Sequence, residues 1–424
     1  MSSKIETSAL SRRAFLRLSA VAGVGAVLAA CGQATPAAAP TAAPAAAPTA
    51  APAAAPTAAP AMAEPTAPAA LPAAPAAGPI DLNAIGGMDK LVEAAKAEGA
   101  LSVIALPNDW ANYGEIKKAF LAKYPFIKLE DLNPDGSSAQ EVEAIKANAG
   151  SKGPQAPDVI DVGFTWGDTA KKDKVLQAYK VATWAEIPDA LKDAEGYWYG
   201  DYYGVMTFEV NTQVVKNVPQ DWSDLLKPEY KGQVALAGDP TGSGQAINAV
   251  WAAALGNGGS LDNAAAGLDF FKKLNDAGNF VPVVAKPATI AKGETPIALR
   301  WDYNALANRD STAGNPEIAV VVPKSGSLAG VYVQAISAYS PRPNAARLWM
   351  EFLYSDEGQL LWLKGYASPA RLDAMKKAGK VPADLLAKLP KYDSPVGIPT
   401  GDQINKAVDA IKAGWTTVVG ATVK

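Results

Sequence analysis

The sequence predicts an α/β fold with mostly parallel sheets, divided into two lobes. Two observations support this fold class. Short apolar runs alternate with stretches of helical periodicity from about residue 101 onward, and such alternation is typical of sheets whose strands are joined through helices. The segment 80–424 is also long enough to form two lobes on one chain. Ligands of such sheets bind beyond the carboxyl ends of strands, so the residues that follow each strand are the candidates for a site.

The first half of this segment predicts strands over 101–106, 127–129 and 158–162, with helices over 115–124 and 140–148. Asp109 and Trp110 follow the first of these strands, and Trp166 follows the third. Because the carboxyl ends of parallel strands lie at one edge of a sheet, these three residues are candidate ligand contacts.

The second half begins with an aromatic stretch that contains Tyr203, followed by an extended apolar segment over 205–210. A strand is expected over 232–237, and helices over 246–255 and 261–277. Thr241, Gly242 and Ser243 lie directly before the first of these helices, where free backbone N–H groups and hydroxyls suit an anion. The alternative is that Ser243 only caps the helix.

The run from Pro296 to Leu299 predicts a buried strand, and it ends in Arg300, Trp301, Asp302 and Tyr303. A buried carboxylate needs a partner. Asp302 therefore either contacts a ligand between aromatic rings or forms an ion pair with Arg300 or Arg309, and Trp301 could simply belong to the core. Further strands are expected over 318–322 and 331–336, the latter with Tyr332, and helices over 344–354 and from residue 403 onward.

The N-terminal region indicates export. Residues 11–16, Ser-Arg-Arg-Ala-Phe-Leu, form a twin-arginine signal, and the apolar stretch 18–30 that follows is shorter than the roughly 20 residues a membrane span needs. Cys31 follows Leu-Ala-Ala, as in the lipobox of bacterial lipoproteins, and is the only cysteine of the chain. We therefore divide the chain into a signal peptide with lipobox (1–31), an Ala/Pro/Thr-rich disordered tether (32–79) and a globular domain (80–424).

The composition argues against most enzymes. The chain has no histidine, so a Ser-His-Asp triad and the usual zinc sites cannot be built. No phosphate-binding GxxxxGK[ST] loop is present, and no cofactor is expected. The net charge of −3 without a basic block argues against nucleic acid as a partner. These absences favour a binding protein, and an envelope hydrolase that uses a carboxylate pair is the alternative class.

Three stretches carry a family resemblance: PQDWSDLLKPEYKGQVALAGDPTGSGQA, IAKGETPIALRWDYNAL and PNAARLWMEFLYSDEGQLLWLKG. They resemble the extracellular solute-binding proteins of ABC importers, and among these the two-lobed type II branch that binds ferric iron, polyamines and phosphonates. The resemblance covers about residues 100–369. It implies a non-catalytic, monomeric receptor outside the cytoplasm, lipid-anchored at Cys31, that delivers a small solute to the transmembrane subunits of a permease.

The resemblance also implies a hinge between the lobes, with the ligand in the cleft and closure around it. Crossing segments are expected near 205–211 and 320–325. Lobe 1 would then comprise about 98–205 and 325–370, lobe 2 about 206–324, and the C-terminal helices about 371–424.

Ferric-binding relatives carry two adjacent tyrosines where this chain has Trp301-Asp302-Tyr303. Only Tyr303 matches, so a ferric site would rest on Asp302 and Tyr303, and no metal is expected otherwise. Polyamine-binding relatives use acidic residues and aromatic rings, which suit an ammonium group. We therefore expect an organic cation (polyamine-like) or an aminophosphonate-like solute, with ferric iron as the alternative. The candidate ligand-binding residues are Asp109, Trp110, Trp166, Tyr203, Thr241, Gly242, Ser243, Trp301, Asp302, Tyr303 and Tyr332.

Overall fold

The structure is a computed structural model in which residues 71–74, 78, 80–391 and 396–424 are described. The twin-arginine motif, Cys31 and nearly all of the expected tether lie outside the described residues. Within the described part of the chain, no helix is both long and apolar enough to cross a membrane. The helices and strands belong to one compact unit, which runs from residue 68 to the C terminus.

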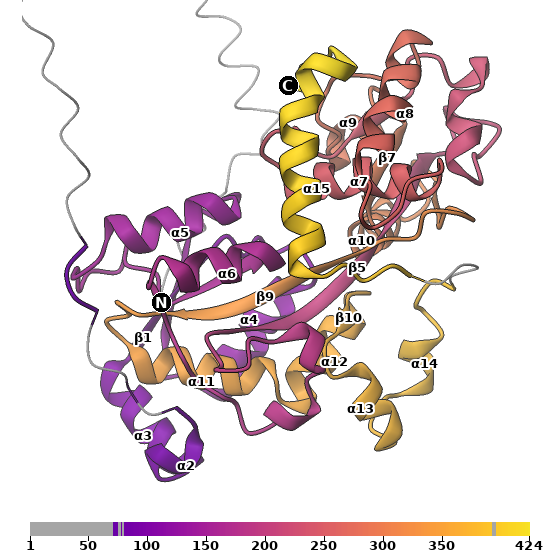
Figure 1. Ribbon diagram of the computed structural model, residues 1–424. Helices are drawn as coiled ribbons and strands as arrows, with labels where there is room; N and C mark the ends of the chain where they lie inside the picture. Colours follow the sequence, from indigo (N-terminus) through magenta and orange to yellow (C-terminus); the bar gives the residue numbers. More distant parts are fainter. Residues whose placement is uncertain (1–70, 75–77, 79, 392–395) are drawn as a thin grey trace, which may run out of the picture. The chain divides into compact units, whose positions relative to one another are not determined.

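The first lobe is built on a sheet made by β3, β4, β9, β10 and the first half of β5, with a separate parallel pair, β1 and β2 (Figure 1). Its helices α4, α11 and α12 contact one another. The strands are β1 (Ala100–Ile104), β2 (Lys128–Leu132), β3 (Val159–Gly163), β4 (Leu176–Gln177), β5 (Trp198–Asn211), β9 (Ala329–Ser337) and β10 (Ser368–Pro369). The helices are α2 (Leu82–Ile85), α3 (Met88–Glu98), α4 (Tyr113–Lys123), α5 (Ser138–Ala147), α6 (Phe164–Lys172), α11 (Pro343–Leu353), α12 (Asp356–Lys364), α13 (Leu372–Lys377) and α14 (Ala383–Leu386).

The second lobe uses the second half of β5 together with β6, β7 and β8. Its core includes Trp222 and Trp251, both fully buried. Helix α15 packs against α7 and α8 of this lobe, and its first residue, Gly401, also lies near Asp168 and Phe164 of α6. The elements are β6 (Val234–Leu236), β7 (Ile297–Trp301), β8 (Ile318–Val321), α7 (Gly244–Leu255), α8 (Ala265–Asp276), α9 (Pro287–Ala291), α10 (Asp302–Thr312), α15 (Gly401–Gly414) and the π-helical turn Trp415–Val419. Short 3-10 turns lie at Trp184–Glu186, Asp189–Leu191, Trp222–Leu226 and Pro228–Tyr230.

Three segments connect the lobes. Strand β5 pairs with β9 up to Val205 and with β7 from Met206 onward, so the strand changes lobes between these two residues. The segment between β8 and β9, residues 322–328, is the second connection. The third is the chain around Gly397, whose carbonyl accepts a hydrogen bond from Ala329 N (2.9 Å).

The structure confirms the α/β class and the two lobes, but the expectation of mostly parallel sheets was wrong. Six of the eight pairings between the described strands are antiparallel. The two long crossing strands, β5 and β9, run antiparallel to each other and to every strand that pairs with them. Only β1–β2 and β6–β7, which are joined through helices, are parallel, as such connections require.

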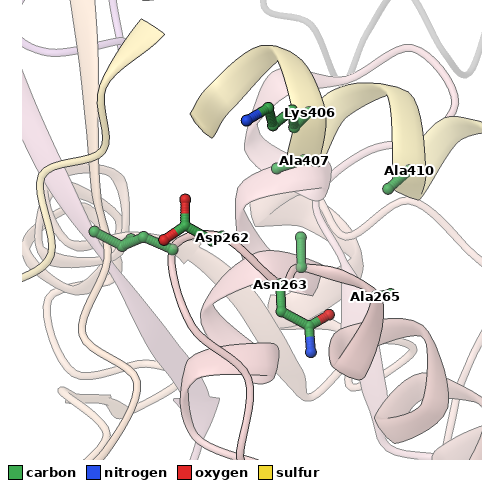
Figure 2. Close-up of a pocket in the computed structure, with 8 residues that line it drawn as sticks. Asp262, Asn263, Ala265, Lys406, Ala407 and Ala410 are labelled. Atoms are coloured by element: carbon green, nitrogen blue, oxygen red, sulfur yellow. The ribbon is translucent and has the colours of Figure 1, made fainter. Parts of the chain in front are cut away.

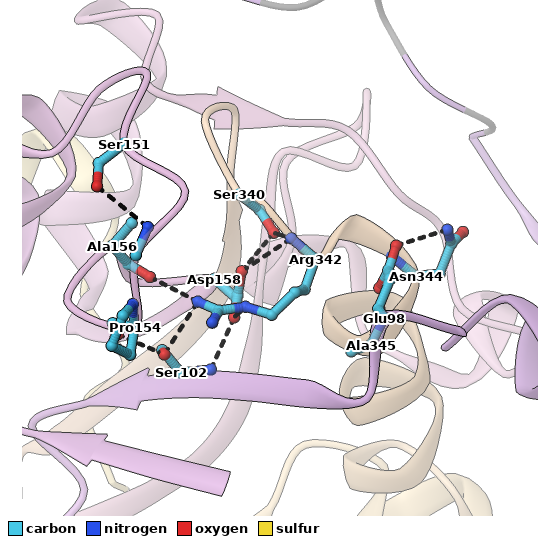
Figure 3. A network of polar contacts seen from close by, with 11 residues as sticks. Glu98, Ser102, Ser151, Pro154, Ala156, Asp158, Ser340, Arg342, Asn344 and Ala345 are labelled. Atoms are coloured by element: carbon cyan, nitrogen blue, oxygen red, sulfur yellow. Dashed lines mark hydrogen bonds and ion pairs between the residues drawn. The ribbon is translucent and has the colours of Figure 1, made fainter. Parts of the chain in front are cut away.

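A buried polar network connects several elements of the first lobe (Figure 3). Arg342 donates to Asp158 Oδ2 (2.7 Å) and to the hydroxyl of Ser102 (3.0 Å). Burial raises the pKa of Asp158 to about 6, although Arg342 and the hydrogen bonds oppose this shift. The Glu98 carboxylate accepts from Asn344 N (3.1 Å) and Ala345 N (2.7 Å) at the start of α11, where a negative charge stabilises the helix. These contacts hold β1, β3 and α11 together.

Candidate functional site

Six aromatic side chains meet close to the point where β5 changes lobes, and we call them the aromatic cluster. Five belong to the first lobe, and Tyr303, from α10, belongs to the second. Three members were predicted as ligand contacts, and two of these, Trp110 and Tyr332, are only partly buried. The cluster consists of Trp110, Tyr113, Tyr202, Tyr303, Tyr332 and Trp362.

Tyr202 lies at the centre of the aromatic cluster. Its ring stacks on Tyr332 with centroids 5.4 Å apart and planes at 5°. Tyr303 meets the edge of Tyr202 at 5.7 Å and of Trp110 at 5.6 Å. Because Tyr303 comes from the other lobe, the aromatic cluster is a contact between the lobes. Tyr202 was not among the predicted contacts, but it touches three residues that were: Trp110, Tyr303 and Tyr332.

A pair of glycines allows the second lobe to approach the crossing strands this closely. Gly204 and Gly330 lie directly opposite each other on β5 and β9. A Cβ atom at Gly330 would lie 2.1 Å from Trp301 Cη2, and one at Gly204 would lie 2.4 Å from Tyr303 Cε1. The rings of Trp301 and Tyr303 therefore pack directly on the backbone of the two crossing strands.

Asp302 begins α10 and is 1% exposed. Its Oδ1 accepts a hydrogen bond from Val205 N (3.0 Å), the last residue of β5 before the strand changes lobes. The two arginines considered as its partners form ion pairs elsewhere, Arg300 with Glu209 (2.8 Å) and Arg309 with Asp310 (2.9 Å). The carboxylate thus fixes the second lobe to the hinge, and its role toward a ligand stays a prediction.

A chain of hydrogen bonds leads from the aromatic cluster to buried acids. Trp110 Nε1 donates to Tyr202 OH (2.7 Å), and Tyr202 OH donates to Asp161 Oδ2 (3.2 Å). Tyr113 OH donates to the same carboxylate oxygen (2.7 Å) and accepts from Gln334 Nε2 (2.8 Å). Asp161 and Gln334 are directly opposite each other on β3 and β9. The partly exposed indole is therefore connected to an interior carboxyl group.

Two further acids lie beside Asp161. The register of β5 against β9 shifts between Gly200 and Tyr202, which marks a β-bulge at Asp201, and a bulge redirects the side chain of the extra residue. Asp201 Oδ2 lies 3.5 Å from Tyr113 OH. Glu141, on α5, accepts a hydrogen bond from Asp161 N (2.9 Å). Glu141, Asp161 and Asp201 are all at most 5% exposed.

Burial raises the pKa of all three carboxyl groups. The pKa of Asp201 rises to about 7. That of Asp161 rises well above its ordinary value, first because of burial and second because of the negative charge of Asp201. The pKa of Glu141 rises for the same two reasons, with Asp161 as the neighbouring charge. None of the ion pairs in the described part of the chain includes any of the three. The group is therefore rich in hydrogen-bond acceptors and has no basic side chain bonded to it.

The other predicted residues lie apart from the aromatic cluster or show no contact with it. Asp109, Thr241 and Gly242 are exposed. Ser243 caps α7, since its side chain accepts from Ala246 N (3.4 Å), which agrees with the capping alternative. Trp166 lies in the first turn of α6 instead of a loop, and Tyr203 is opposite Ser368 of β10. Whether these residues bind a ligand stays a prediction.

A hollow of about 230 Å³ lies in the second lobe between α15 and the loop before α8 (Figure 2). Its lining combines Asp262, Asn263 and Lys406 with Leu261 and four alanines. None of the predicted site residues lines it, so we do not take it as the functional site. Within the described residues, no group of three or more Asp, Glu, Cys or His side chains could hold a metal ion.

The acids behind the aromatic cluster were not among the residues predicted from the sequence. Asp161 lies inside an apolar strand run, and Asp201 lies between glycine and tyrosine in the aromatic stretch. A carboxylate in the interior of a buried strand is rare unless it has partners, and this signal could have identified both. The β-bulge that brings Asp201 to Asp161 has no comparable signal.

Comparison with known proteins identifies the family. Residues 155–395 match the model of the bacterial extracellular solute-binding proteins, and the chain belongs to this family. An uncharacterized protein of Haemophilus influenzae is 30% identical over 264 residues, which cover 58% of this chain and 71% of that protein. A sulfate-binding protein of Salmonella typhimurium is 26% identical over 249 residues, 55% of this chain and 71% of the relative.

Solved structures show the same fold. The periplasmic binding protein AfuA of Actinobacillus pleuropneumoniae, with fructose-6-phosphate bound, has a TM-score of 0.57 at 22% identity, over 76% of this chain and 99% of that chain. Iron-bound HitA of Pseudomonas aeruginosa has a TM-score of 0.57 at 20% identity, over 74% of this chain and 98% of that one. At these identities the likeness concerns the fold, which is that of two-lobed periplasmic binding proteins. The expected class, a type II solute-binding receptor of an ABC importer that acts outside the cytoplasm, agrees with family and fold.

Proposed function

We propose that the protein captures a small organic cation between its lobes and delivers it to the transmembrane subunits of an ABC permease. The observation that carries this proposal is that the aromatic cluster lies next to three buried carboxyl groups, those of Glu141, Asp161 and Asp201. Trp110 and Tyr332 are the members of the aromatic cluster that remain partly exposed. A cation over an aromatic face is stabilised by about 0.5–2 kcal/mol, and Asp201, whose pKa is about 7, adds a favourable potential in its ionised form.

Two buried oxygen atoms near the aromatic cluster can accept a hydrogen bond from a donor, while the indole N–H of Trp362 is a donor without a partner among the described residues. The buried oxygen Gln334 Oε1 and the hydroxyl of Tyr303 make no hydrogen bond to any described residue. An ammonium group supplies several donors and no acceptor. A sulfate or phosphate would instead face buried acids without a basic side chain to compensate its charge, which is unfavourable. We therefore do not propose sulfate or fructose-6-phosphate, the ligands named for two of the relatives, as the ligand of this chain.

An aminophosphonate-like solute, the second ligand that the sequence suggested, also presents an ammonium group and would place it in the same position. Ferric iron would rest on Asp302 and Tyr303. Asp302 Oδ1, however, already accepts two backbone hydrogen bonds, from Val205 N (3.0 Å) and Tyr303 N (2.8 Å). A hydrolase would need Asp161 and Asp201 to face its substrate, whereas they are 5% and 0% exposed. These contacts favour the organic cation.

The proposal includes the twin-arginine export signal and lipid attachment at Cys31. The spacing of these motifs supports both. A lipid anchor followed by a tether would keep a monomeric receptor near its permease, and no cofactor is required for this function.

Thermal unfolding with four probes at two pH values tests the ligand class. Spermidine, 2-aminoethylphosphonate, sulfate and ferric citrate are each added to the full-length protein at pH 6 and pH 8. A bound cation favours the ionised form of Asp201, whose pKa is about 7, so its affinity should rise with pH, by up to about tenfold for each unit by which the cation lowers that pKa. We expect an amine to raise the melting temperature, and to raise it more at pH 8 than at pH 6. Stabilisation by sulfate or iron alone would contradict the proposal.

A further inference from the structure

A second contact between the lobes lies outside the aromatic cluster. Arg309 and Asp310 are in the last turns of α10, and Tyr366 follows the end of α12. Tyr366 OH donates a hydrogen bond to Asp310 Oδ2. The guanidinium carbon of Arg309 lies 5.8 Å from the centre of the Tyr366 ring, and Arg309 forms an ion pair with Asp310 (2.9 Å). The three side chains form one polar group.

The two sides of this group belong to different lobes. Helix α10 packs on β5, β7 and β8 of the second lobe, whereas α12 packs on α4, α11 and β10 of the first (Figure 1). Any opening of the lobes that separates α10 from the end of α12 must therefore break the hydrogen bond between Tyr366 and Asp310.

The backbone at Tyr366 indicates that its side chain is needed there. Helix α12 ends in a Schellman motif, because Ala367 N donates to Trp362 O (3.1 Å) and Tyr366 N to Leu363 O (3.0 Å). Tyr366 occupies the left-handed position of this motif with a φ of 70°. Glycine is the favoured residue at such a position, since a side chain is strained there. Tyrosine is strained at this position relative to glycine, and its contact with Asp310 is one that glycine could not make.

The neighbouring glycine does not relieve this strain. Gly365 precedes Tyr366, and a Cβ atom at Gly365 would lie 2.3 Å from Asn112 Cβ. The chain thus uses glycine where α12 approaches the loop before α4, and places an aromatic residue at the position that glycine would favour.

The pKa of Asp310 indicates that the partner of Tyr366 is charged. Burial alone would raise the pKa of Asp310, but the hydrogen bond from Tyr366 and the charge and hydrogen bonds of Arg309 outweigh it and lower the pKa. Lys388, which follows α14, acts in the same direction. Asp310 is therefore ionised at neutral pH, and its hydrogen bond with Tyr366 is charge-assisted.

We propose that Arg309, Asp310 and Tyr366 form a latch that holds the two lobes together and sets how readily they open. The side chains of Arg309 and Asp310 are 42% and 50% exposed, so water replaces the broken contacts on opening. An interaction of this kind shifts the equilibrium modestly without locking it, which suits a receptor that must release its solute. The proposal depends on movement of the lobes and not on the identity of the ligand.

Single-molecule energy transfer without ligand tests the latch. The full-length chain carries Cys31→Ser, with dyes on Lys128→Cys in the first lobe and Lys292→Cys in the second, two positions that are 79% and 69% exposed. We expect Tyr366→Phe and Asp310→Asn each to lower the ratio of closed to open molecules by about threefold to tenfold, which is the loss of one hydrogen bond. Ratios within a factor of two of the parent for both variants would overturn the proposal.

Two further variants separate a latch from a structural role. Tyr230→Phe removes a phenol hydrogen bond that lies within the second lobe, from Tyr230 OH to Asn217 O (2.8 Å), and should leave the ratio unchanged. Tyr366→Gly relieves the left-handed backbone but removes the ring. It should preserve or raise the melting temperature while still lowering the closed ratio. The latch would be contradicted if Tyr366→Gly had the same ratio of closed to open molecules as the parent. It would also be contradicted if Tyr230→Phe lowered this ratio as much as Tyr366→Phe does.

Discussion

Replacement of Asp201 by asparagine should change how the stability of the protein depends on pH. The pKa of the Asp201 carboxyl group is raised by burial from 3.8 to about 7. Between these values the folded state binds more protons than the unfolded state, so the free energy of unfolding falls as pH rises through this window. One pKa unit corresponds to about 1.4 kcal/mol, and the shift therefore sets an upper limit of about 4 kcal/mol.

Asparagine has the same shape and cannot ionise. The stability of Asp201→Asn relative to the parent should therefore rise steadily from about pH 4 to about pH 7 and level off above it. The size of this change is expected to be about 2 kcal/mol or more, because the interaction with Asp161 is shared between the two groups. The assay is urea unfolding monitored by tryptophan fluorescence at intervals across this pH range.

Asp109→Asn serves as the matched control, because Asp109 is exposed in the loop after β1. It should follow the pH dependence of the parent. The reasoning would be refuted if Asp201→Asn also ran parallel to the parent at every pH, since Asp201 would then carry its charge in the folded state at no cost.

Two further substitutions test the hinge. Gly330→Ala should destabilise the protein by roughly 1–3 kcal/mol, because the added Cβ would lie 2.1 Å from Trp301; Gly242→Ala, which meets no atom within 4 Å, is the control in the same urea titration, and equal stability of the two variants would disprove the close packing. Asp302→Ala removes the acceptor for Val205 N and should cost about 1–3 kcal/mol, whereas Asp302→Asn keeps an acceptor and should retain most of the stability. If Asp302 also contacts a cationic ligand, calorimetry with a stabilising probe will show weaker binding to Asp302→Asn; unchanged affinity would restrict this residue to the hinge.

The sequence was sufficient to predict the two lobes and most of the long strands and helices in order, but not helices α6 and α10, which begin directly after β3 and β7. Apolar runs such as 296–299 and periodic segments such as 344–354 depend on local patterns, and they lie in β7 and α11. The predicted direction of strand pairing was wrong, because it depends on the pairing of β5 with β9, two strands that are more than 100 residues apart in the chain. Alternation of strands and helices carries no information about such long crossing strands.

The candidate site was predicted in part. Trp110, Tyr303 and Tyr332 are in contact, with Trp110 in the loop after β1, Tyr303 in the first turn of α10 after β7, and Tyr332 within β9. Tyr202, Asp161 and Asp201 were not selected, since their proximity depends on a bulge in β5 and on the exact register of β3 with β9. Register is a property of the folded sheet and is not visible in the composition of a single strand.

Mass spectrometry of the small molecules released from the purified protein tests the central claim most directly. The protein is isolated without added solute, desalted, and denatured, and the released compounds are compared with those from a variant in which Trp110 is replaced by alanine. We predict that the parent releases a compound with at least one amine that is cationic at neutral pH, and that Trp110→Ala releases much less of it. Release of sulfate, a sugar phosphate or iron in stoichiometric amounts would contradict the assignment of an organic cation.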